Sequence, residues 1–129
     1  MAQRKRKGKT ARESADHYRS LFEHALEGIF RSTPEGRFVE VNPALVRLLG
    51  YESIEEVLAL TLPDDLYVDL VQRERLRATY EAAGVVEGEE LLWKKKSGGH
   101  IIVSLYARAI RDRRGRSAEH WVNGWEMLG

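Results

Sequence analysis

Cysteine is absent from this sequence of 129 residues. The chain therefore has no disulfide bonds, no thiolate metal ligands, no cysteine nucleophile and no cofactor attached through sulfur. Long hydrophobic runs are absent too, because none approaches the roughly 18 residues of a membrane-spanning helix. The basic start is not followed by an apolar segment, so it lacks the pattern of a secretory signal. We therefore expect the protein in the cytoplasm.

Residues that could form a catalytic or metal site are few and dispersed. The four histidines are scattered along the chain, and exposed or hydrogen-bonded histidines explain them better than a shared metal does. The acidic pairs are sequence neighbours, whose side chains point apart on a helix or strand. No glycine-rich phosphate loop is present. We predict neither enzymatic activity nor a bound metal; the residues weighed for these roles are His17, His24, His100, His120, Glu55, Glu56, Asp64, Asp65, Glu89 and Glu90.

The distribution of charge separates the start of the chain from the rest. Six of the 21 basic residues and none of the 20 acidic residues lie within residues 1–12. The other 117 residues carry 15 basic and 20 acidic side chains, and this mildly acidic balance argues against a nucleic-acid-binding face. We predict that residues 1–10 form a disordered, solubilising basic tail. The alternative is a tether to nucleic acid or to a membrane surface through residues 4–12.

The segment after the tail has the pattern of an amphipathic helix. Thr10-Ala-Arg-Glu13 has the residue types of a capping box, and apolar side chains follow at helical spacing. We predict a helix over residues 11–26. Its apolar stripe consists of Tyr18, Leu21, Phe22 and Ala25.

A hairpin and several helices are predicted next. Two β-prone runs, 29–33 and 37–41, flank a Pro-Glu-Gly turn. Asn42 and Pro43 then have the residue types of an N-cap and a first helical position, and Gly50 is the expected end of that helix. Further helical segments are expected over 53–59, 63–68 and 70–83, the last with Leu76, Tyr80 and Ala83 on its buried side.

The last third of the chain predicts a β-meander from the extended runs 85–96, 101–112 and 116–128. Alternation along the middle run directs its odd-numbered side chains toward the helices. On the run before it, Leu91 and Trp93 are predicted to face the same way. On the last run, alternation leaves two choices: either the small side chains around Val122 or the pair Trp121 and Trp125 face inward.

The order of these elements and several motifs resemble a PAS domain, the sensory module of many bacterial signalling proteins. The stretch YRSLFEHALEGIFRSTPEGRFVEVNPALVRLLGY carries the hairpin, the Asn-Pro helix start and the Leu-Gly-Tyr ending, and DDLYVD, WKKKSGG and RAIRDRRGR match later segments. The resemblance spans residues 18–128. It implies an α+β fold with a five-stranded antiparallel sheet, short helices on one face and an N-terminal flanking amphipathic helix. The chain would then comprise a tail (1–10), the flanking helix (11–26) and a PAS domain (27–129).

Two departures from the family pattern accompany this resemblance. Asp69-Leu70 stands where many members have Asp-Pro at the start of the long helix, and Glu126-Met127-Leu128 stands where an Asp-Ile-Thr-like triplet usually leads to the next domain. Because no effector domain follows in these 129 residues, two interpretations stay open: a domain excised from a longer protein, and a stand-alone sensor module.

The resemblance also implies that no cofactor is bound. Light-sensitive flavin members need a cysteine beside the ring, and haem-binding members use a histidine on the long helix, where residues 70–84 have none. Flavin-binding relatives place amide side chains on the inner sheet face, at positions that match Trp93, Val103 and Gly124 here. We therefore expect a colourless protein.

An apolar cavity between the sheet and the helices remains as a candidate ligand site. A small apolar or amphipathic ligand is the expected class, with the hydroxyl of Tyr80 and the indole N–H of Trp93 as polar contacts. The alternative is that these side chains form an ordinary core in which Trp93 fills the space of a pocket. The predicted lining is Phe30, Leu45, Leu49, Leu66, Leu76, Tyr80, Leu91, Trp93, Val103 and Leu105.

The other face of the sheet is a candidate interface. Alternation places Ile102 and Tyr106 there, and matching the last hairpin to the family adds Trp121 and Trp125, with Leu92 beside them. Large apolar side chains gathered on one face usually mark an interface. We predict that this face and the helical stripe cover one another, within one chain or across a dimer. The predicted interface is Tyr18, Leu21, Phe22, Ala25, Leu92, Ile102, Tyr106, Trp121 and Trp125.

The function that the resemblance implies is sensing or protein interaction in signal transduction. The module would form a homodimer and pass a signal to a downstream kinase, cyclase or regulator, with or without a small apolar ligand. Two hypotheses of other classes stay open: a ligand-free structural dimerisation module, and the tether through residues 4–12.

Overall fold

A single antiparallel sheet organises the chain. The computed structural model describes residues 10–111 and 117–127, and side chains for residues 10–109. The sheet has five strands in the order β2-β1-β5-β4-β3. The elements are α2 (Ala11–His24), β1 (Gly28–Ser32), β2 (Phe38–Val41), α3 (Pro43–Leu49), α4 (Ile54–Leu58), η1 (Leu62–Leu66), α5 (Leu70–Ala83), β3 (Val85–Lys94), β4 (His100–Arg111) and β5 (Ser117–Met127). The predicted α+β class with antiparallel strands is confirmed.

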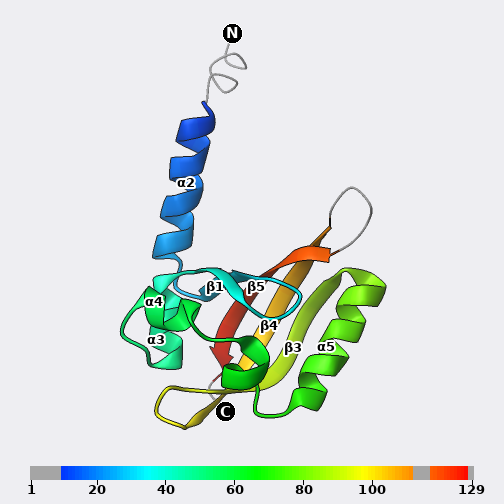
Figure 1. Cartoon of the computed structure of the whole chain (residues 1–129). Helices are drawn as coiled ribbons and strands as arrows, with labels where there is room; N and C mark the ends of the chain where they lie inside the picture. Colours follow the sequence, from blue (N-terminus) through cyan, green and yellow to red (C-terminus); the bar gives the residue numbers. More distant parts are fainter. Residues whose placement is uncertain (1–9, 112–116, 128–129) are drawn as a thin grey trace.

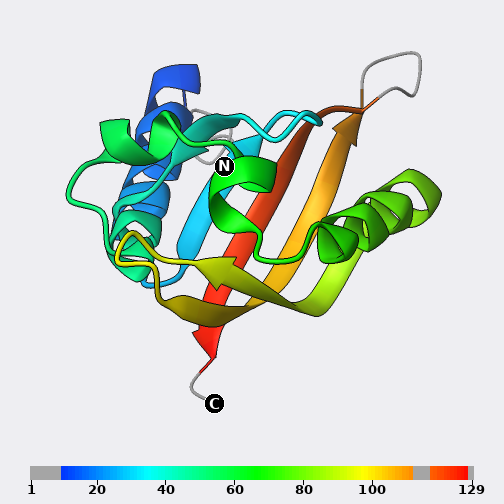
Figure 2. The ribbon, with the colours of Figure 1, turned by 60° about the horizontal axis from the view of Figure 1, so that its bottom comes forward.

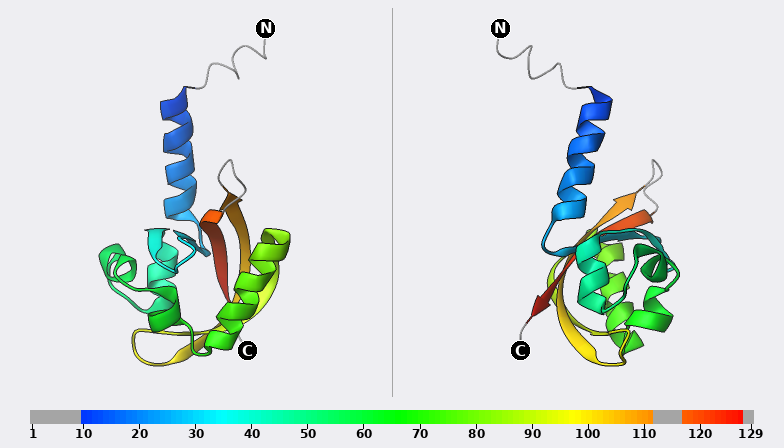
Figure 3. Two further views of the ribbon diagram at one scale, coloured as in Figure 1. Left: turned by 45° about the vertical axis from the view of Figure 1, so that its right-hand side comes forward. Right: turned by 90° about the vertical axis from the view of Figure 1, so that its left-hand side faces the viewer.

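The helices after β2 share one face of this sheet. Figure 2 shows α3, α4, η1 and α5 in front of the strands, and the edge-on view in Figure 3 places them on the same side. The helix α2 instead extends away from the domain beside β1 and α3 (Figure 1). Within the described ranges, no helix is long and apolar enough to span a membrane.

Local capping sets most helix boundaries. Asn42 accepts a hydrogen bond from the backbone N–H of Leu45 at 3.1 Å and starts α3, while Gly50 ends it in the left-handed conformation. Ser53 and Glu56 form both hydrogen bonds of a capping box at α4. The helix α5 begins after Asp69 and ends before Gly84, as predicted. Caps of this kind act within about four residues, which is why the sequence pattern predicts them.

Three details differ from the predictions. The first helix ends at His24 rather than residue 26, because Ala25 is already extended as the chain turns toward β1. The helical segment predicted over 63–68 is a π-helix, η1, and it spans Leu62–Leu66. Ala83 is exposed rather than buried, since α5 ends there and the chain turns into β3, which is an edge strand.

The hydrophobic core lies between the sheet and the helices. On β4, Val103 and Leu105 are 0% and 1% exposed, whereas Ile102 and Tyr106 on the other face are 42% and 38% exposed. This alternation confirms the predicted direction of β4. Its register with β3 pairs Val103 with Leu91, so the inner faces of both strands meet the helices together. Residues 1–9, which hold most of the predicted basic tail, lie outside the described part of the chain.

Candidate functional site

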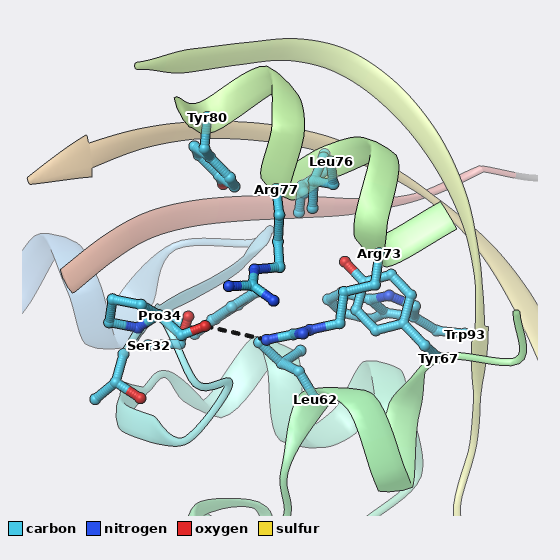
Figure 4. Close-up of a pocket in the computed structure, with 12 residues that line it drawn as sticks. Ser32, Pro34, Leu62, Tyr67, Arg73, Leu76, Arg77, Tyr80 and Trp93 are labelled. Carbon is cyan, nitrogen blue, oxygen red and sulfur yellow. Dashed lines mark hydrogen bonds between the residues drawn. The ribbon is translucent and has the colours of Figure 1, made fainter. Parts of the chain in front are cut away.

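A small cavity lies between α5, η1, the β1–β2 turn and the inner face of the sheet (Figure 4). Its volume is about 30 Å³. A void of this size has room for about two water-sized groups. Twelve residues line it: Phe30, Ser32, Thr33, Pro34, Leu62, Tyr67, Arg73, Leu76, Arg77, Tyr80, Trp93 and Leu105.

The mouth of the cavity is basic. Figure 4 shows the side chains of Arg73 and Arg77 running from α5 toward Pro34. Arg73 Nη2 donates a hydrogen bond to the carbonyl oxygen of Pro34 at 3.1 Å. Burial, and then the charge of Arg77, lower the pKa of the Arg73 guanidinium, which nevertheless stays charged at neutral pH. Arg77 Nη1 lies 3.6 Å from Glu74 Oε1 in an exposed pair.

Trp93 closes the inner end of the cavity. Its side chain is 0% exposed, and its ring lies 5.8 Å from that of Phe30 and 5.9 Å from that of Tyr67. Among the described residues, no acceptor is in hydrogen-bonding geometry with its indole N–H. Burial is the main cause that raises the pKa of the Tyr67 hydroxyl, and the nearby indole of Trp93 offsets part of that rise.

All ten residues predicted to line a pocket are buried in the core. Only half of them line the cavity, namely Phe30, Leu76, Tyr80, Trp93 and Leu105. The others, Leu45, Leu49, Leu66, Leu91 and Val103, pack elsewhere in the core.

Sequence reasoning missed the polar rim of the cavity. The lining residues that it missed come from the end of β1 and the β1–β2 turn (Ser32, Thr33, Pro34), from η1 and the residue after it (Leu62, Tyr67) and from α5 (Arg73, Arg77). One signal in the sequence could have identified the arginines. Arg73 and Arg77 lie three residues before and one residue after Leu76 on the predicted helix, and so they border the side of the helix that faces the core.

The positions compared with flavin-binding relatives lie on three neighbouring strands, β3, β4 and β5. Trp93 and Val103 are both 0% exposed and belong to the core. Gly124 lies opposite Gly28 of β1 and Leu105 of β4 in the sheet register. Within the described residues, no group of three or more histidine, aspartate and glutamate residues could hold a metal ion.

A second candidate region is the predicted interface. The helix α2 buries none of its residues: Tyr18 and Leu21 are 43% and 60% exposed, and Phe22 and Ala25 are half-buried. Tyr18 stacks on Phe22 and donates to Glu40 Oε2 of β2 at 3.3 Å. The stripe thus lies beside the β2 edge of its own domain, and not over the outer face of the sheet as one of the two predicted arrangements required.

The outer face is described only in part. Leu92 is half-buried, and Ile102 and Tyr106 are exposed. In the register, Trp121 is opposite Arg31 and Arg108, and Trp125 is opposite Ser104. The side chains of both tryptophans lie outside the described residues, so their predicted outward direction stays a prediction.

One buried amide joins α2 to the domain. Asn42 is 0% exposed, and its Nδ2 donates to the carbonyl oxygens of Phe22 and Glu27, both at 3.0 Å. Its Oδ1 accepts from the backbone N–H groups of Ile29 at 2.9 Å and Leu45 at 3.1 Å. The side chain therefore uses all four of its hydrogen-bonding positions and holds the end of α2, the start of β1 and the first turn of α3 together.

Comparisons with known proteins agree with this architecture. A family model described as the PAS fold matches residues 16–122. The chain is 39% identical over 69 residues to the probable diguanylate cyclase DgcE of Escherichia coli (strain K12); the match covers 50% of this chain and 6% of the cyclase. The chain thus spans only a small part of that relative's length.

Two solved structures of domains from sensor proteins are similar to this chain. A domain of a sensory box sensor histidine kinase/response regulator from Geobacter sulfurreducens has 28% identity and a TM-score of 0.71, and the match covers 90% of this chain and 96% of that one. A PAS domain from a two-component sensor histidine kinase has 21% identity and a TM-score of 0.74, with 92% and 100% covered. The second likeness concerns the fold alone.

Proposed function

Since this chain belongs to the PAS family, we propose that it is a sensory module that forms a homodimer and relays a signal to an effector. A probable diguanylate cyclase and a sensor histidine kinase are among the proteins it resembles. They support a cyclase or a kinase as the effector class. In this proposal the module has no flavin or haem, because Trp93 is buried in its interior and the remaining cavity is about 30 Å³. The proposal also assigns it no enzymatic activity.

The observation that carries the proposal is the state of α2. This helix has 14 residues, an apolar stripe and no buried residue. Isolated helices of that length are marginal in water, and most helical stability comes from packing of the apolar face. The contacts of Tyr18 with Glu40 and of Asn42 with Phe22 hold the C-terminal half of α2 against the domain. A second copy of the chain that covers Leu21 and its neighbours supplies the missing packing.

The outer face of the sheet extends the same interface in this proposal. Ile102 and Tyr106 are exposed there, and the predicted direction of Trp121 and Trp125 would enlarge the apolar area. Aromatic residues are enriched in the cores of interfaces. In this proposal the signal passes between the interface and the domain through Asn42, which joins α2 to β1. The strand β1 in turn pairs with β5.

The test compares the oligomeric states of two protein variants, one substituted at Leu21 and one at the neighbouring Ser20. Leu21→Asp places a charge in the apolar stripe, whereas Ser20→Asp places the same side chain on the opposite side of α2. Burial of a leucine contributes about 1.5–3 kcal/mol, and a symmetric dimer loses it twice, so the dissociation constant for Leu21→Asp should rise by about a hundredfold or more. Sedimentation equilibrium measures it. A monomeric parent protein, or equal dissociation constants for the two variants, would reject the proposal.

A further inference from the structure

The carboxylate of Glu40 links α2 to two strands of the sheet. Its Oε1 accepts a hydrogen bond from Arg31 Nη2 of β1 at 2.8 Å, and its Oε2 accepts one from the Tyr18 hydroxyl of α2 at 3.3 Å. We propose that α2 moves between a docked and a released position, and that the contact between Glu40 and Tyr18 controls this equilibrium. The inference rests on the proposed function in one respect, because it names the contact that regulates the relay.

The sheet sets the position of this carboxylate. Glu40 and Arg31 are directly opposite each other in the register of β2 and β1, and cross-strand pairs of opposite charge attract each other. Their side chains are 33% and 24% exposed, so solvent screens this pair less than a fully exposed one. Burial, and then the charge of Glu40, raise the pKa of the Tyr18 hydroxyl, as expected for a donor beside a carboxylate. A change in the position of β1 or β2 therefore moves the acceptor of Tyr18.

Two hydrogen bonds between α2 and the domain differ in how easily they break. In the last turn of α2, the carbonyl oxygen of Phe22 accepts from the fully buried Asn42 side chain at 3.0 Å, and a buried polar group that loses its partner is costly. One turn earlier, the bond from Tyr18 is exposed and 3.3 Å long. Loss of such a bond shifts an equilibrium by only about fivefold. Asn42 is therefore the pivot of α2, and the bond to Glu40 breaks first.

Packing leaves α2 room to move. A groove of about 400 Å³ lies between this helix, β2 and α4. Its walls include Phe22 of α2, Val39 of β2 and Ile54 of α4, and the last two are 38% and 37% exposed. Since α2 buries none of its residues, its release leaves the core closed. A released helix of 14 residues is marginal in water, so its backbone hydrogen bonds open.

Amide hydrogen exchange measures the released population, because an open helix loses its protection. All variants carry Leu21→Asp and are studied at a concentration where sedimentation equilibrium shows monomers, so that no dimer holds α2. Tyr18→Phe deletes only the hydroxyl and keeps the ring that stacks on Phe22. We expect the amides of α2 to exchange about fivefold faster in this variant. The amides of β4 and the amide of Ile29, which donates to Asn42, should keep their rates.

Glu40→Gln and the double variant test whether the two residues act through one bond. A glutamine side chain has one oxygen for the two donors, Arg31 and Tyr18, so Glu40→Gln should also accelerate the exchange of α2. The further effect of Tyr18→Phe should then largely disappear in the Glu40→Gln background. Glu35→Gln is the matched control, because Glu35 is an exposed residue of the β1–β2 turn, and it should leave the exchange of α2 unchanged.

Equal acceleration in α2 and β4 would overturn the inference, since it would show a loss of overall stability and not release of the helix. Unchanged exchange of α2 in Tyr18→Phe, additive effects of the two substitutions, or an equal effect of Glu35→Gln would overturn it too. Any of these results together with a dimer that depends on Leu21 rejects control by Glu40 and leaves the proposed dimer standing. A monomeric parent protein whose α2 responds as expected rejects the dimer alone.

Discussion

Replacement of Trp93 by alanine tests whether this side chain holds the sheet and the helices together. The side chain is 0% exposed and contacts the rings of Phe30 and Tyr67. A tryptophan buries roughly 150–250 Å², which at about 25 cal/mol per Å² stabilises the fold by about 4–6 kcal/mol. The indole N–H without an acceptor offsets about 1–3 kcal/mol of this. We therefore expect Trp93→Ala to lower the free energy of unfolding by about 3 kcal/mol, the lower end for buried aromatics.

The assay is urea unfolding followed by circular dichroism, which does not depend on the tryptophan itself. Leu92→Ala is the matched control, because Leu92 is the preceding residue on β3 and is only half-buried on the opposite face. It should cost about 1 kcal/mol. Trp93→Phe keeps an aromatic ring and removes the buried N–H, so its loss should be clearly smaller than that of Trp93→Ala.

A loss below about 1 kcal/mol for Trp93→Ala, with an unchanged denaturant slope, would contradict this reasoning. It would mean that the indole contributes no more to the free energy of unfolding than a surface side chain does. Addition of indole to Trp93→Ala provides a second check, since a preserved cavity of the right shape should bind it and regain part of the lost stability.

Two further substitutions test other parts of the structure. Asn42→Ala removes the four hydrogen bonds of a buried side chain. We expect a loss of about 3 kcal/mol or more in the free energy of unfolding and faster proteolysis between α2 and β1. Unchanged cleavage there would contradict the role of Asn42 in joining α2 to the domain. Glu56 accepts hydrogen bonds from Lys96 and from backbone N–H groups, which lower its pKa from the ordinary 4.5. Because the pKa is lower in the folded state, this stabilisation is present above pH 4.5 and is lost as the pH falls through the folded value. Unfolding measured between acidic and neutral pH should therefore depend less on pH in Glu56→Gln than in the parent protein, and equal slopes would exclude the effect.

The parts of the fold that depend on near neighbours could be predicted from the sequence. Asn42 and Gly50 cap α3 through contacts within a few residues, and alternation along β4 is a property of consecutive residues. The boundaries of α5 follow from its caps in the same way. The π-helix η1 could not be predicted, because its residues carry no pattern that separates it from an ordinary helical turn.

The candidate site was harder to predict because its parts are distant in sequence. Arg73 contacts the carbonyl oxygen of Pro34, which is 39 residues away, and no local pattern links them. Periodicity identified Trp93 and Leu105 as inward-facing side chains, but it does not say which buried residues border a void. The sequence pattern therefore predicted an apolar pocket, whereas the cavity has a polar and basic rim.

The position of β5 has a consequence for synthesis of the chain. It is made after the other four strands of this sheet, yet it lies in the middle of the sheet between β1 and β4. Until residues 117–127 have left the ribosome, the hairpin of β1 and β2 and the hairpin of β3 and β4 have no strand to join them, and each exposes an unpaired edge. Pairing between residues near the two ends of a chain closes long loops and is slow. Such edges invite pairing with other chains. A nascent chain of this protein thus depends on β5 both to complete its sheet and to escape aggregation.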